Sequence, residues 1–196
     1  MSNFWYEIVD RGKPITQGDI IFDCPLITWQ TNQLDKHESI ESENLKNAIE
    51  GIAADVVVMT QACDLKFNKV SNVILCPHFS LEEYRKFWGN EMEKRNQVVT
   101  KKAWESHCDD ICEGFVWNLT MLNSAKVVEL SIDTRIVDFH EVFSVPRQFL
   151  ESLLQQRATQ RFRLLPPYRE HLSQAFARFF MRVGLPSNIP PFCTSS

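Results

Sequence analysis

The sequence lacks an apolar run long enough to cross a membrane. Its longest runs, such as Val56–Met59 and Val73–Cys76, cover only four residues each, whereas a membrane-spanning helix needs roughly 20. The first residues, Met1–Glu7, contain an acid where a signal peptide has basic residues followed by an apolar stretch. We therefore expect a cytoplasmic protein that makes no contact with a membrane.

Cysteine is scarce, with six residues in a chain of 196. Three of the six lie in or beside apolar segments, which favours buried thiols in a reducing compartment over a disulfide framework. No low-complexity tract is present, and a hydrophobic fraction of 44% with a charged fraction of 23% is typical of a folded globular protein. We expect one domain with an appendage.

Lysine is absent from the last quarter of the chain, and this absence accompanies a charge asymmetry. Residues 1–145 carry 14 Lys and Arg against 23 Asp and Glu, a net charge of −9. Residues 146–196 carry seven Arg and two Glu, a net charge of +5. We expect the basic segment either to pack on the acidic body or to bind an anionic partner.

Strand-like segments dominate the first half. Gln17–Ile27 is typical of a turn followed by a strand, in which Pro25 indicates a sheet edge or the end of the strand. Asp55–Thr60 is apolar on both faces, which predicts a central strand. A second apolar segment, Asn72–Pro77, is expected to pair with it.

Helical spacing follows these strands. Ser80–Asn96 has apolar residues at helical intervals and begins with the capping-box pair Ser80 and Glu83. A further helix is predicted from Thr100 to about Cys112, so we expect a helical insertion near residues 80–113. A short helix is also predicted over Asn44–Ala54, within a polar connection. Strand-like composition resumes over residues 115–143.

The basic segment after residue 145 is predicted to contain two helices. The second follows Pro167 and carries one apolar face, and Gly184 and Pro186 supply its end. We predict an α+β protein with a body over residues 1–145 and a basic helical C-terminal segment over 146–196, packed on the body.

Candidate catalytic residues lie just after the two central strands. Cys63 and Asp64 follow the first strand, and His78 follows the second. A thiol, a carboxylate and an imidazole are groups that act as nucleophile, base or acid. Cys63, Cys76 and His78 would form a zinc site if the fold brought them together, but their spacing matches no established zinc motif. The alternative, buried thiols and a surface histidine, is favoured, so we assign no metal and no cofactor.

Six arginines of the C-terminal segment are candidate nucleic-acid contacts, because guanidinium groups bind phosphates and the aromatic residues between them offer stacking surfaces. They are Arg157, Arg161, Arg163, Arg169, Arg178 and Arg182. The alternative is that the amphipathic helix of this segment packs into the groove of a protein partner.

The order of these segments resembles that of the PemK/MazF toxin family. The resemblance rests on Gly18–Ile21 as an opening strand, Val56–Thr60 as an apolar strand ending in threonine, and Val73–Pro77 as a strand ending in proline. It implies a small SH3-like β-barrel, and toxins of this family cut single-stranded RNA as dimers. The chain departs from the family at Ala53–Asp55, where family members place Arg-Pro, and at His78, where they place threonine or serine.

These departures weaken the ribonuclease interpretation, because the missing arginine would stabilise charge in the transition state. The sequence therefore predicts a nucleic-acid-associated accessory protein of toxin–antitoxin or phage-defence type, or a degenerate ribonuclease, with RNA, DNA or a second copy of the chain as partner. A protein-interaction module and a zinc-binding protein are the alternatives.

Overall fold

The computed structural model describes residues 5–30, 48–127, 130–157 and 159–181. Within them the chain folds into antiparallel sheets covered by helices, which confirms the predicted α+β class. The sheets do not close into a barrel. No helix in these ranges is long and apolar enough to span a membrane.

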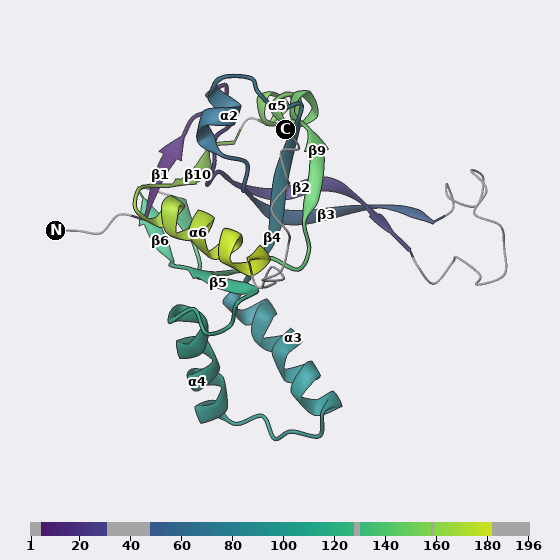
Figure 1. Cartoon of the computed structure of the whole chain (residues 1–196), viewed down its shortest axis with the longest axis vertical. Coiled ribbons are helices and arrows are strands. Elements are labelled where there is room, and N and C mark those ends of the chain that lie inside the picture. Colours follow the sequence, from purple (N-terminus) through teal and green to yellow (C-terminus); the bar gives the residue numbers. More distant parts are fainter. Residues whose placement is uncertain (1–4, 31–47, 128–129, 158, 182–196) are drawn as a thin grey trace, which may run out of the picture.

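The first three strands of the main sheet are consecutive in the chain, whereas the strands that pair with the other edge of the third come from much later in the sequence (Figure 1). Its order is β2-β3-β4-β8-β5, and β9 pairs with the first half of β4. The strands are β2 (Ile20–Trp29), β3 (Ile49–Val58), β4 (Asn72–Ser80), β5 (Leu119–Leu122), β8 (Arg135–Asp138) and β9 (Phe143–Pro146).

The inner end of β3 is buried on both faces, as its sequence predicts. Val57 belongs to one hydrophobic cluster, and Val56 and Val58 belong to another on the opposite face. All three side chains are fully buried. β3 pairs with β4 as expected, and β2 lies at the sheet edge and continues through Pro25 to Trp29.

Two small strand pairs complete the sheets. β1 (Tyr6–Val9) pairs with β10 (Arg161–Leu164), and β6 (Ala125–Val127) pairs with β7 (Leu130–Ile132). β10 corrects the sequence prediction, which placed two helices and no strand in the basic segment. The reason is a period of two: Phe162 and Leu164 enter the core, while Arg161 and Arg163 point to the other face.

The predicted helical insertion is present as a hairpin of α3 (Leu81–Lys94) and α4 (Lys101–Cys112), which projects from the sheet (Figure 1). The capping box of Ser80 and Glu83 is formed. The two helices pack through a ring cluster in which the hydroxyl of Tyr84 and Nε2 of His107 are 2.9 Å apart. Trp88 and Trp104 border the same histidine.

The remaining helices are α2 (Ala62–Lys66), α5 (Arg147–Gln156) and α6 (Tyr168–Phe180). α5 and α6 contribute Leu150 and Leu172 to the two different clusters, so they cover opposite faces of the main sheet. The helix predicted over Asn44–Ala54 is wrong where it can be compared, because β3 begins at Ile49. Its first four residues lie outside the described ranges, as do Gly184 and Pro186.

Candidate functional site

The structure does not bring the three predicted catalytic residues together. Cys63 is exposed on α2, where its thiol lies 3.7 Å from both Gln61 and the carboxylate of Asp64. His78 is buried in β4. Within the described ranges, none of the hydrogen bonds or ring contacts of His78 reaches Cys63 or Asp64. The geometry therefore does not place the imidazole of His78 as a base beside this thiol.

His78 instead belongs to a buried polar cluster with Arg135 and Asp55. Nε of Arg135 donates to Nδ1 of His78 at 2.9 Å, and the same guanidinium pairs with the carboxylate of Asp55. Burial, followed by the nearby Arg135 charge, lowers the pKa of His78 to about 3, although the Val56 carbonyl opposes the shift. His78 is therefore neutral at neutral pH, and its buried Nε2 forms no hydrogen bond of good geometry with any of the described residues.

Metal binding finds no geometric support. Cys76 is buried in the core, where desolvation raises the pKa of its thiol to about 12. Cys63, by contrast, is exposed on the surface. In the part of the chain that the structure describes, no three His, Cys, Asp or Glu side chains are grouped so that they could hold a metal ion.

The predicted phosphate-binding arginines have partners within the chain. Arg161 and Arg163 both donate to the fully buried carboxylate of Asp19, at 2.8 and 2.5 Å. The guanidinium of Arg157 donates to the carbonyls of Phe22 and Asp23. These three arginines hold the basic segment on the body, which is the first of the two roles expected for it.

The other arginines are closer to the surface. Arg169 pairs with Glu170 at 2.5 Å, and Arg178 lies over the ring of Trp117 at 5.5 Å. Arg182 lies outside the described ranges. The apolar face of α6 is also largely used internally, since Phe176 and Phe179 pack against the core, although Phe180 remains 58% exposed.

One recess at the surface was not anticipated from the sequence. It is a groove of about 990 Å³ between the outer half of the β2–β3 arm and the segment that leads through β9 into α5. One wall is the uninterrupted run Pro25–Trp29, joined by Gly51 and Ile52, and the other is the run His140–Pro146, joined by Phe149.

Exposed apolar side chains gather at this groove. Trp29 is 56% exposed and Ile27 is 69% exposed on one wall, while Val142 and Phe149 are partly exposed on the other. Adjacent exposed apolar residues of this kind mark an interaction surface more often than an isolated one does. The sequence did contain an indication of this surface. Apolar residues occupy both faces of β2 as far as Trp29, beyond the part of the strand that contributes to the core.

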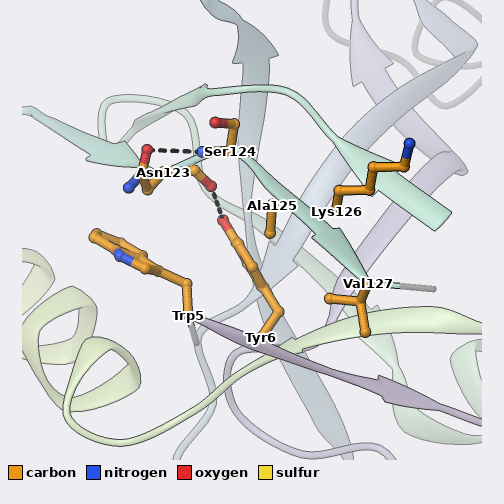
Figure 2. A pocket seen from close by; sticks show the side chains of 7 residues that line it. All are labelled: Trp5, Tyr6, Asn123, Ser124, Ala125, Lys126 and Val127. Carbon is orange, nitrogen blue, oxygen red and sulfur yellow. Dashed lines mark hydrogen bonds between the residues drawn. The ribbon is translucent and has the colours of Figure 1, made fainter. Parts of the chain in front are cut away.

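A smaller recess lies beside Trp5 and Tyr6 (Figure 2). Its volume is about 170 Å³, below the range of roughly 300–1,000 Å³ usual for small-molecule sites. The hydroxyl of Tyr6 donates to the carbonyl of Asn123 at 2.9 Å, and the ring of Trp5 stacks on Tyr168. These contacts join the start of the described chain to the sheet, so this recess is a structural junction.

Another recess, of about 510 Å³, lies where the helical hairpin joins the sheet. Its wall combines Arg85 with the acids Glu82 and Asp133, and the guanidinium of Arg85 lies over the ring of Trp104. The charges are mixed and exposed, so this recess selects for no ligand charge.

Fold and site together define an α+β protein with an open apolar groove at one end of its main sheet. A comparison with models of known protein families found no match, and a comparison with curated proteins also found none.

Proposed function

We propose that the protein is a protein-interaction module that binds a segment of a partner protein in the apolar groove. The observation that carries the proposal is the coincidence of this groove, the largest of the three recesses described above, with exposed Ile27, Trp29 and Phe149. Aromatic residues in a concave apolar setting are the usual anchors of protein–protein contacts. The surface used is therefore the groove, and not the C-terminal helix that the sequence suggested.

A selection from a random peptide library, using the immobilised full chain as bait, tests this function. We expect peptides to be enriched on the native protein and to lose at least tenfold in affinity on the Phe149→Asp variant, because a charge in the groove wall must be desolvated on binding. A Val98→Asp variant is the matched control, since Val98 is 82% exposed on the connection between α3 and α4. Absence of any enriched peptide that depends on Phe149 would contradict the proposal.

Association with nucleic acid is a second candidate, supported by a different surface. The connection between α3 and α4, together with the helix ends that flank it, carries four exposed cations, Lys94, Arg95, Lys101 and Lys102. Lys94 and Lys101 pair with Glu91 and Glu105, which leaves Arg95 and Lys102 as the cations without an ion pair in the described ranges. In this version the arginines of the basic segment stabilise the fold, and the helical hairpin contacts phosphates.

Anisotropy of labelled single-stranded RNA and duplex DNA at low and moderate salt tests this second candidate. Binding that weakens steeply with salt, and weakens further in an Arg95→Gln/Lys102→Gln variant, would support it. Cleavage of the recovered probe would support the toxin-like interpretation. No binding at low salt would contradict both.

We also propose that the β2-β3-β4 sheet is related to the SH3-like barrels, as the resemblance to the PemK/MazF family implies. Its support is the antiparallel pairing of these strands, which are consecutive in the chain. An accessory role in a toxin–antitoxin or phage-defence system, in the cytoplasm, would follow from that relationship.

A further inference from the structure

Consecutive residues line both walls of the apolar groove, which is expected at the edge of a strand and not on its face. Successive side chains of a strand point to opposite faces, so a recess that lies on a face is lined by every second residue. Here both walls are uninterrupted: all of Pro25–Trp29 and all of His140–Pro146 line the groove. The recess therefore runs along the backbone of both segments.

Pro25–Trp29 belongs to β2 and Phe143–Pro146 is β9, whereas the wall residues that precede β9 lie outside any strand; β2 and β9 are each paired on one side only. β2 pairs with β3, and β9 pairs with β4, and within the described ranges no strand occupies their other edges alongside the groove. Unpaired strand edges present backbone donors and acceptors that bind another extended chain. The groove thus combines an apolar surface with hydrogen-bonding edges.

Among the described residues, a side chain covers the inner part of the β2 edge but not its outer part. A bulge between Ile21 and Cys24 interrupts the pairing of β2 with β3. The guanidinium of Arg157 covers this bulge by donating hydrogen bonds to the carbonyls of Phe22 and Asp23. No equivalent side chain covers the edge beyond Pro25 within the described residues. Protection therefore ends where the groove begins.

From these features we propose that the groove binds its partner as an added β-strand, an inference that rests on the function proposed above. The partner segment is extended, with apolar side chains at every second position directed toward Trp29, Phe143 and Phe149. Glu141 lies on the wall and forms no ion pair in the described part of the chain. A basic residue near one end of the segment would pair with it, whereas a proline within the segment would remove a ladder donor.

The peptides enriched in the selection described above supply the probe for this inference. One enriched peptide is synthesised and then N-methylated at one residue at a time, and its affinity for the full chain is measured. Because successive N–H groups of a strand point in opposite directions, we expect methylation to reduce affinity at least tenfold at alternate positions and to have little effect at the positions between. The enriched sequences should also show apolar residues with a period of two.

A Gly51→Val variant provides a second readout. A Cβ at Gly51 meets no atom within 4 Å, so the substitution is compatible with folding while it adds volume inside the groove. We expect at least a tenfold loss of peptide affinity with unchanged circular dichroism. Thermal unfolding of the variant shows whether any loss reflects misfolding, and the Phe149→Asp variant gives an independent block.

The outcomes separate the two proposals. Failure to enrich any groove-dependent peptide overturns the proposed function. Enriched peptides that bind with helical periodicity, with repeated prolines, or with equal sensitivity to methylation at all positions overturn the added strand but leave the interaction module standing. A concentration-dependent dimer that the Gly51→Val variant abolishes would show that a second copy occupies the groove, and would overturn both proposals in favour of self-association.

Discussion

The two ends of the β2–β3 pair differ in what surrounds them. At the inner end Ile20, Val56 and Val57 are fully buried between two hydrophobic clusters, whereas at the outer end Ile27, Trp29 and Ile49 are exposed. Side chains of the same type are thus used for the core at one end and for the groove at the other. The difference shows that strand propensity fixes the element, while the length of the covering helices and strands decides where the core stops.

The inner end also carries buried charges, and their removal should have the largest effect. Asp19→Asn would leave the guanidinium groups of Arg161 and Arg163 without their carboxylate. We expect a loss of about 3–5 kcal/mol in the free energy of unfolding, measured by urea denaturation. Asp109→Asn, at an exposed position on α4, is the control and should change stability by less than about 0.5 kcal/mol.

A matched pair of isoleucines in β2 tests the comparison directly. Ile20→Ala removes a side chain that is 0% exposed, and Ile27→Ala removes one that is 69% exposed. We expect the first change to cost about 2–5 kcal/mol through loss of burial and a residual cavity, and the second about 0.5 kcal/mol. Equal losses in urea denaturation would show that the outer end is also buried in solution.

The neutral His78 should make the inner end sensitive to acid. Its pKa is about 3 in the folded protein and 6.5 in the absence of structure, so the unfolded state binds the proton more tightly. Stability is therefore complete above about pH 6.5 and falls as the pH is lowered toward 3, by about 1.4 kcal/mol per pH unit within this window.

Replacement of that histidine isolates its contribution. His78→Gln retains an oxygen that can accept the hydrogen bond from Nε of Arg135, but it does not titrate. Between pH 6.5 and 4.5 we expect the native protein to lose about 3 kcal/mol more than the variant. Parallel pH profiles for the two proteins would refute the assignment of a neutral, buried imidazole.

The smallest effect on stability is expected at the outer end. Gly51→Val adds a side chain in open space on a strand, where valine is favoured over glycine. The free energy of unfolding should stay within about 0.5 kcal/mol of the native value or rise slightly. Gly18→Val is the contrasting change: Gly18 has φ +84°, and an added Cβ would lie 3.0 Å from Cβ of Leu164, so this variant should be clearly less stable.

Local patterns in the sequence were sufficient for most elements of the fold. The apolar run at Val56–Val58 predicts a central strand because only a strand with both faces covered tolerates it, and the capping box at Ser80 fixes the start of α3. Strand β10 was not predicted, because it has only four residues and lies between two helical segments. Its two arginines suggested contacts with an anionic partner, whereas both pair with Asp19 inside the protein.

Tertiary structure alone decided the partners of the charged residues and the position of the groove. Asp19 and Arg161 are 142 positions apart in sequence and meet only because β10 returns beside the start of β2. The groove likewise joins residues 25–29 to residues 140–146, two segments whose separation gives no local signal. A sequence specifies which residues are apolar or charged, but long-range strand pairing determines which of them are buried, paired or left open to a partner.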